Sequence, residues 1–314
     1  MALHRLNQIT IGVPNVESTA EYYTDFGLTP SGLETGSGVA SFATADGGEQ
    51  LRVVHSDHRT LKELRIGAED LDGIERIVAS LTRLDIPFTR IENGLRAQDP
   101  GTAVSVVVEV AERIAQNPTP TPRYNSPADP SRANSRAPGI GRTDRVRPRK
   151  LGHVVLGSID QESSQRFFSG GLGLKVSDTV PGLAAFLRCS TDHHNVLIQQ
   201  APLAFLHHTA WEVDDIDEVG RGATAMLEGH PERHVWGLGR HHVGSNFFWY
   251  LRDPAGNFSE YYSDLDCIVD DAVWKPGVFE GAHGLYNWGP PPPASFLAPE
   301  DLAGLMTAGH GAAS

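Results

Sequence analysis

Residues 151–158, with the sequence LGHVVLGS, repeat the pattern of residues 6–13, LNQITIGV. Both stretches are rich in apolar and β-branched side chains, which is typical of strands. Each stretch continues into a helix-like segment that contains an aromatic pair, at residues 22–23 in the first copy and 167–168 in the second. The chain therefore consists of two related halves.

A second motif recurs inside each half. Residues 64–72, LRIGAEDLD, parallel residues 209–217, TAWEVDDID, and in both a strand leads into a helix that begins with acidic residues. Each half thus holds two units of strand, helix and further strands, and one unit of this size cannot bury its own apolar face. The sequence predicts an α+β fold of four βαβββ units paired into two domains, the C-terminal one an incomplete barrel around a cavity.

A proline-rich stretch separates the two halves. Residues 116–150 contain seven prolines and no apolar periodicity, which indicates an extended linker. The end of this stretch is basic, and we interpret it as a solvated or partner-contacting arm. The predicted domains are an N-terminal domain at 1–115, the linker at 116–150, a C-terminal domain at 151–266 and an irregular arm at 267–314.

The composition excludes several classes of protein. The 314 residues are 39% hydrophobic, enough for two cores, and the net charge of −13 has the wrong sign for a nucleic-acid partner. No window of 18 apolar residues and no signal peptide occur, so we expect a cytoplasmic protein without a membrane partner. Cys189 and Cys267 are too few for a disulfide framework or a thiolate zinc site. A metal here must use nitrogen and oxygen ligands.

Histidines gather in the C-terminal half. Eight of the fourteen lie between residues 193 and 242, at His193, His194, His207, His208, His230, His234, His241 and His242. His153, His208 and Glu260 occupy comparable places on different predicted strands, and two imidazoles with one carboxylate suit Fe(II) or Mn(II). At the positions that match the two histidines, the N-terminal half has Gln8 and Glu63. We therefore expect one metal per chain and a metal-free N-terminal domain.

Four motifs in combination resemble a known family: LGHVVL at 151–156, LHHTAWEV at 206–213, GRHHVGSN at 239–246 and YLRDPAGNFSEYY at 250–262. They are similar to those of the type I extradiol ring-cleaving dioxygenases of the vicinal oxygen chelate superfamily, and the resemblance covers about residues 1–290. It implies that the incomplete barrel of the C-terminal domain encloses the metal site. The implied cofactor is Fe(II), or in some members Mn(II).

The resemblance also implies a set of site residues. The metal ligands would be His153, His208 and Glu260. The catalytic residues would be His194, His241 and Tyr250. His194 would move protons, and His241 and Tyr250 would hold the substrate oxygens. The spacings agree with this set: His208 lies fourteen positions after His194, Tyr250 lies nine positions after His241, and Glu260 lies ten positions after Tyr250.

The activity that the resemblance implies is an oxidoreductase reaction in aromatic catabolism. Such an enzyme cleaves a substituted catechol with O2 next to the diol and gives a muconic semialdehyde type product. A redox-active metal is needed because triplet dioxygen reacts slowly with a singlet catechol. The expected partners are a catecholic small molecule and O2, with assembly as a homo-oligomer.

Two other functions stay open at this point. Some members of the superfamily are isomerases or lyases that use the chelated substrate without oxygen, and they do not need the set His194, His241 and Tyr250. Related small-molecule-sequestering proteins share the fold but lack the metal triad. The sequence also leaves open which member of each histidine doublet faces the cavity, because neighbouring side chains of a strand point to opposite faces.

Aromatic residues predict the substrate pocket. Relatives that bind carboxylated catechols carry an arginine five residues before His241, where this chain has Trp236. Phe247 and Trp249 add aromatic area nearby, and Arg240 is the remaining cation. We take these four residues as the substrate-binding set. The sequence therefore predicts a preference for a neutral, apolar and bulky substituent on the catechol.

Overall fold

The computed structural model describes residues 2–34, 38–280, 285–301 and 305. The N-terminal half contains two consecutive units. The first comprises β1 (Leu3–Val13), α1 (Val16–Asp25), β2 (Thr29–Glu34), β3 (Val39–Thr44) and β4 (Gly48–His55). The second comprises β5 (Thr60–Ala68), α2 (Leu71–Arg83), β6 (Phe88–Ile91), β7 (Gly94–Gln98) and β8 (Ser105–Val110).

The C-terminal half repeats this order. Its first unit comprises β9 (Lys150–Ser158), α3 (Gln161–Gln165) with a π-helical turn η2 (Arg166–Gly171), β10 (Lys175–Val180), β11 (Ala184–Arg188) and β12 (Val196–Gln200). Its second unit comprises β13 (Phe205–Glu212), α4 (Ile216–Leu227), a short 3-10 turn η3 (Pro231–Arg233), β14 (His234–Arg240), β15 (Phe247–Arg252) and β16 (Phe258–Ser263). The segment that follows carries β17 (Gly277–Val278) and α5 (Ala294–Leu297).

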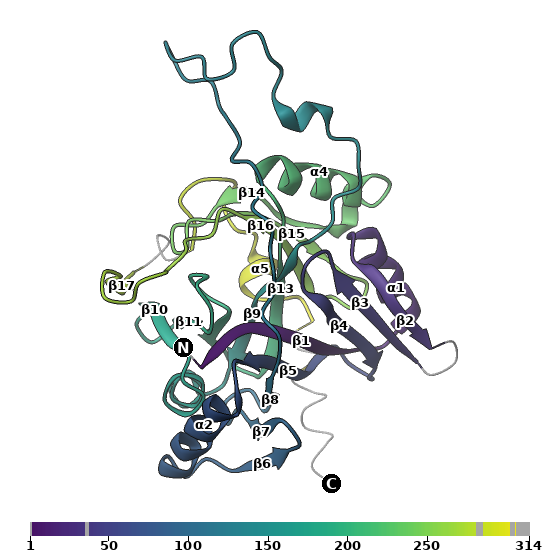
Figure 1. Cartoon of the computed structure of the whole chain (residues 1–314). Coiled ribbons are helices and arrows are strands. Elements are labelled where there is room, and N and C mark those ends of the chain that lie inside the picture. Colours follow the sequence, from purple (N-terminus) through teal and green to yellow (C-terminus); the bar gives the residue numbers. More distant parts are fainter. Residues whose placement is uncertain (1, 35–37, 281–284, 302–304, 306–314) are drawn as a thin grey trace.

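The two halves form two sheets with the same strand order (Figure 1). The first sheet runs β2-β3-β4-β1-β5-β8-β7-β6, and the second runs β10-β11-β12-β9-β13-β16-β15-β14 with β17 added beside β10. In each sheet the first strands of the two units, β1 with β5 and β9 with β13, pair antiparallel at the centre. The predicted α+β fold of four paired βαβββ units is therefore confirmed.

Acidic residues begin the second helix of each half, as the sequence pattern predicts. The Asp70 carboxylate accepts a hydrogen bond from the Gly73 amide at the start of α2, and Asp215 accepts one from the Glu218 amide at the start of α4. Each carboxylate satisfies an amide that has no partner within its helix. After these helices, the last strand of each unit returns to the sheet: β8 pairs with β5, and β16 pairs with β13.

Aromatic residues at the end of α1 pack against the outer face of the second sheet. The rings of Phe26 and Tyr261 stack with centroids 3.9 Å apart, and the Tyr261 hydroxyl donates to the Phe26 carbonyl at 2.6 Å. Tyr261 follows Glu260 directly, so the two side chains of β16 point to opposite faces. The N-terminal half therefore holds the outer face of β16, while Glu260 points into the cavity of the second sheet.

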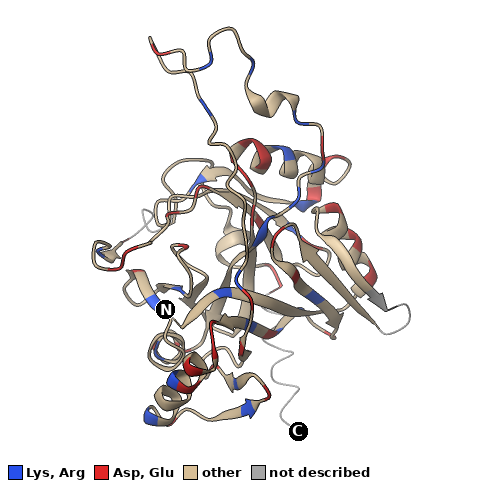
Figure 2. Ribbon diagram, viewed as in Figure 1, with Lys and Arg blue, Asp and Glu red and all other residues tan. Residues whose placement is uncertain are grey.

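The segment between the halves projects from the body and includes a short 3-10 turn, η1 (Pro138–Gly141) (Figure 1). Figure 2 shows basic residues along it and acidic residues on α1 and α4. Arg142 forms two hydrogen bonds with Asp215 at 2.9 and 2.6 Å, and Arg149 pairs with Asp46 at 2.5 Å and Asp214 at 2.9 Å. Part of the basic cluster is thus tied to carboxylates of its own chain. None of the described helices is both long enough and apolar enough to cross a membrane.

Candidate metal centre

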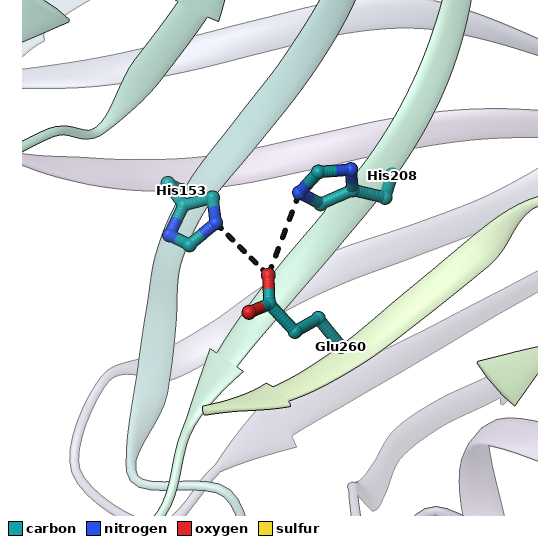
Figure 3. A group of neighbouring side chains, drawn as sticks. All are labelled: His153, His208 and Glu260. Carbon is teal, nitrogen blue, oxygen red and sulfur yellow. Dashed lines mark hydrogen bonds and ion pairs between the residues drawn. The ribbon is translucent and has the colours of Figure 1, made fainter. Parts of the chain in front are cut away.

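Three neighbouring strands bring His153, His208 and Glu260 together (Figure 3). Ala210 of β13 pairs with His153 of β9 on one side and with Glu260 of β16 on the other, so these side chains face the same way. His208 precedes Ala210 by two positions and shares that face. The Glu260 Oε2 atom lies 3.1 Å from His153 Nε2 and 3.4 Å from His208 Nε2. Their ligand atoms all lie within 4.8 Å of one another.

The protonation states of His208 and Glu260 suit metal binding. Burial lowers the pKa of His208 to about 4, so its imidazole is neutral. Burial alone would raise the pKa of Glu260, but the neighbouring His153 and His208 hold that pKa well below its usual range. Neutral imidazoles and an ionised carboxylate are the forms that bind a metal.

The surroundings of the triad fit a divalent cation. Glu260 is completely buried, and the described residues that line the adjoining cavity include no lysine or arginine. A buried carboxylate without a nearby positive charge costs several kcal/mol, which a bound cation would offset. His153 Nδ1 is buried without a hydrogen-bond partner. Two imidazoles and one carboxylate form the donor set of open Fe(II) and Mn(II) sites.

His241 and Tyr250 form a hydrogen-bonded pair beside the triad. His241 Nδ1 lies 2.6 Å from the Leu285 carbonyl oxygen, and its Nε2 lies 2.8 Å from the Tyr250 hydroxyl. A carbonyl only accepts, so Nδ1 carries the hydrogen; burial lowers the pKa of His241, so Nε2 is an acceptor for the Tyr250 hydroxyl. Burial and the charge of Glu260 raise the pKa of Tyr250 well above its usual value. Tyr250 therefore stays protonated.

His194 lies next to His153. Their ring centroids are 4.2 Å apart, and His194 is buried. Its Nδ1 is 3.0 Å from Nδ1 of His193, whose Nε2 is 2.8 Å from an Asp178 oxygen. Burial, followed by the nearby His153 and His193, lowers the pKa of His194 well below its usual value. His194 therefore rests as a neutral imidazole next to the triad.

The three histidine doublets differ in which member lies at the site and in what the other member contacts. In the doublet at 207–208, His208 faces Glu260 and His207 contacts the Phe296 carbonyl at 2.7 Å. In the doublet at 193–194 both members are buried and hydrogen bonded to each other. In the doublet at 241–242, His241 reaches the site, whereas His242 is exposed and its ring lies 5.4 Å from that of Phe279. The six predicted metal-binding and catalytic residues thus converge on one place.

Apolar side chains line the cavity in front of the triad. They come from β9, β11, β12, the loop after β14 and the C-terminal segment, and they are Val155, Phe186, Leu197, Val243, Leu285 and Phe296. Gln199 is the one polar lining residue among the described residues that is neither histidine nor tyrosine. The surface available to a substituent is therefore apolar.

The four predicted substrate-binding residues lie elsewhere. Phe247 and Trp249 alternate with Phe248 and Tyr250 along β15, so they occupy the outer face of the sheet. The Trp249 indole N–H donates to His234 Nδ1 at 3.1 Å. Because of this alternation, Phe247 and Trp249 do not line the cavity, contrary to the expectation from the sequence.

Arg240 and Trp236 are also outside the cavity lining. Arg240 pairs with Asp264 at 2.7 Å, and its guanidinium lies 4.2 Å from the ring centroid of Phe247. Trp236 is 1% exposed, stacks on Tyr250, and donates its indole N–H to the Pro290 carbonyl at 2.7 Å. Trp236 supports Tyr250 from behind, while the cavity wall comes from other strands and from the C-terminal segment.

Sequence reasoning missed three polar residues around the site. Asn246 donates a hydrogen bond to Glu260 Oε1 at 3.1 Å, His207 contacts His208, and His193 links His194 to Asp178. Asn246 ends the motif GRHHVGSN, and the two histidines are the first members of doublets. Each was visible as part of a motif, but its contact depends on strand pairing that the sequence does not specify.

The first sheet has different residues at the corresponding positions. Arg65 of β5 pairs with Gln8 and with Val107, as Ala210 pairs with the triad residues His153 and Glu260. Glu63 lies where His208 lies in the second sheet, and it forms ion pairs with Arg65 at 2.7 Å and Arg96 at 2.8 Å. A metal-free N-terminal half stays a prediction.

Known families and proteins share this architecture. Residues 150–261 match the family described as the Glyoxalase/Bleomycin resistance protein/Dioxygenase superfamily. The chain is 31% identical over 310 residues to metapyrocatechase 2 of Cupriavidus necator, a match that covers 94% of this chain and 92% of that relative. It is 28% identical over 139 residues to the iron-dependent extradiol dioxygenase of Rhodococcus jostii (strain RHA1), which covers 40% of this chain and 46% of the relative.

A solved structure extends the match to the whole fold. The Mn(II)-bound glyoxalase from Novosphingobium aromaticivorans superposes with a TM-score of 0.73 at 24% identity, over 93% of each chain. At this identity the likeness shows the fold alone, whereas the match to the relative from Cupriavidus necator covers nearly both chains. The chain therefore belongs to the glyoxalase/bleomycin resistance protein/dioxygenase superfamily and, within it, to the type I extradiol ring-cleaving dioxygenases.

Proposed function

We propose that this extradiol dioxygenase binds Fe(II), or alternatively Mn(II), through His153, His208 and Glu260 and cleaves a catechol that carries a neutral, apolar substituent. The observation that carries this proposal is the convergence of the triad with His194 and the hydrogen-bonded Tyr250 on one apolar cavity. The relatives named as a metapyrocatechase and an iron-dependent extradiol dioxygenase support the reaction and the metal.

The bound metal would supply Lewis acidity toward the catechol oxygens and the redox activity that lets O2 react with them. Tyr250 keeps its proton, and its hydroxyl oxygen can accept a hydrogen bond from one catechol hydroxyl. His241 accepts the Tyr250 hydroxyl hydrogen at Nε2 and thereby orients that hydroxyl. The pair would fix the ring position during cleavage.

His194 has the arrangement of a proton acceptor. With its one ring hydrogen on Nε2, where the Asp178 carboxylate accepts it, His193 would offer a bare Nδ1. His194 would then donate its Nδ1 hydrogen to that atom and keep Nε2 bare. Nε2 of His194 can take a proton from the substrate and return it later, which is the behaviour of a general acid–base group.

The apolar lining supports the choice of substrate. A carboxylate on the catechol would meet Phe186, Leu197 and Val243 and would cost several kcal/mol without a cation. An alkyl or aryl group would instead gain about 25 cal/mol for each Å² that it buries. The two reactions without oxygen, isomerisation and elimination, do not use the His241 and Tyr250 pair, so the geometry favours ring cleavage.

The test is anaerobic reconstitution with Fe(II), followed by oxygen uptake and absorbance of the ring-opened product across a panel of catechols. The expected result is one O2 consumed per catechol cleaved, with activity lost in Glu260→Ala. Conversion of substrate by the iron-loaded protein without oxygen uptake would identify an isomerase or lyase. Expectations of a homo-oligomer in the cytoplasm stay predictions, and light scattering of the purified protein tests the oligomer.

A further inference from the structure

His207, which directly precedes the proposed ligand His208, makes two hydrogen bonds in the buried site. Its Nε2 is 2.7 Å from the carbonyl oxygen of Phe296 in α5, and its Nδ1 is 2.8 Å from Nδ1 of His208. The carbonyl of Phe296 can only accept. Nε2 of His207 therefore carries a hydrogen.

The other nitrogen of His207 is bare. The side chain is 4% exposed, and its ring packs against those of Phe258 and Phe296 with centroids 5.6 and 4.8 Å away. Among the described residues, no carboxylate lies within ion-pair distance to stabilise a positive charge on it. A neutral imidazole carries one hydrogen, so Nδ1 of His207 accepts the hydrogen bond from Nδ1 of His208.

This hydrogen bond determines whether His208 Nε2, the proposed metal-binding atom, carries a hydrogen. With its hydrogen on Nδ1, His208 presents a bare Nε2 toward Glu260 Oε2 at 3.4 Å. The opposite tautomer would place a hydrogen on Nε2 and donate it to Glu260, which blocks the site. The acceptor on His207 decides between these two arrangements.

We propose that His207 is a positioning residue that fixes His208 in its metal-binding tautomer and is itself held by the Phe296 carbonyl. The role rests on the proposed metal site, and it couples the C-terminal segment to that site. Side chains that orient a metal-bound histidine through its second nitrogen typically change metal affinity by about 10- to 100-fold when they are replaced. His207 belongs to this group although it is not a ligand.

Two substitutions of nearly equal size separate the hydrogen bond from the packing. His207→Asn keeps an oxygen acceptor near the position of Nδ1, whereas His207→Leu keeps the volume and removes the acceptor. The dissociation constant of Mn(II) is measured by electron paramagnetic resonance of the free ion, with the thermal melting temperature of each variant as a check on folding. His207→Leu should weaken Mn(II) binding by about 10- to 100-fold, and His207→Asn should recover most of this loss.

The outcomes distinguish the two proposals. If wild-type protein binds Mn(II) and both variants bind equally well, or if both lose affinity equally, the acceptor on His207 does not matter and the positioning role is wrong. If wild-type protein binds no Mn(II), the metal site itself is wrong. His242→Asn, a change at an exposed histidine, serves as the control and should leave affinity unchanged.

A second readout needs no metal. In protein labelled with nitrogen-15 at histidine, the imidazole spectrum of the metal-free chain should show the hydrogen of His208 on Nδ1 and that of His207 on Nε2. In His207→Leu the hydrogen of His208 should move toward Nε2, where Glu260 can accept it. A His208 whose Nδ1 is bare in the wild-type protein would overturn the proposal.

Discussion

Asn246 donates its side-chain N–H to Glu260 Oε1 at 3.1 Å, which leaves Glu260 Oε2 to face both imidazoles of the triad. The amide would thus decide which carboxylate oxygen a bound metal meets. Asn246 is completely buried and lies in the loop directly before β15. Its contact with Glu260 joins the motif GRHHVGSN to the triad.

The first prediction concerns this hydrogen bond. Asn246→Ala should weaken metal binding by about 10- to 100-fold, because Glu260 loses the group that orients its carboxylate. The measurement is the Mn(II) dissociation constant at fixed pH. Asn246→Ala with wild-type affinity and wild-type melting temperature would show that Glu260 is oriented by other contacts.

The second prediction concerns His194. His194→Phe should keep one metal per chain and still bind catechol, because His194 is not among the grouped ligand atoms. Its kcat should fall by about 10² to 10⁴, the usual loss when an acid–base group is removed. Metal analysis and steady-state oxygen uptake check both parts. Unchanged kcat at saturating substrate would contradict the role.

The third prediction concerns the carboxylate behind His193. Asp178 Oδ1 accepts the Gly277 amide hydrogen at 2.5 Å, so in Asp178→Asn the amide oxygen should stay at that position and the NH2 group should face His193. His193 would then carry its hydrogen on Nδ1, and His194 would have to carry its own on Nε2. That tautomer cannot accept a proton from substrate.

Asp178→Asn should therefore lower kcat by about 10²-fold or more while metal content and KM change little. Oxygen uptake with a catechol at saturation is the measurement. Asp178→Asn with wild-type kcat would show that His194 works without the hydrogen-bond chain through His193.

The fourth prediction concerns substrate preference. The wild-type ratio kcat/KM should be higher for a phenyl- or alkyl-substituted catechol than for 3,4-dihydroxyphenylacetate at neutral pH. Gln199→Arg adds a cation to the apolar lining and should shift the preference toward the carboxylated substrate by at least about tenfold, because an arginine can pair with a carboxylate. A wild-type preference for the carboxylated substrate would contradict the apolar pocket.

The sequence predicted the parts of the fold that are repeated and local. The two copies of the strand motif, at 6–13 and 151–158, predicted four paired units, and the sheets have the same strand order. The triad was predicted from residue type and its position in the repeat, because ligand chemistry restricts the candidates strongly. The domain boundaries and the metal-free state of the N-terminal half stay predictions.

The parts that the sequence did not specify depend on contacts between distant segments. Phe247 and Trp249 were assigned to the pocket, but one residue of register decides the face of β15, and Tyr250 takes the inner face. The Phe296 carbonyl meets His207 across 89 positions of the chain, and no local pattern announces that pairing. The aromatic residues of the sequence predicted an apolar pocket. The cavity lining is apolar, but it is formed by residues other than Trp236, Phe247 and Trp249.

The most direct test of the metal site is anomalous diffraction at the iron edge from crystals of the Fe(II)-reconstituted protein. The expected result is one anomalous peak per chain, within about 2.0 to 2.3 Å of His153 Nε2, His208 Nε2 and Glu260 Oε2, distances typical of first-row metals with these donors. A peak bound to other residues, or a second peak of equal height near Glu63 in the N-terminal half, would contradict the assignment of these three residues as the iron ligands.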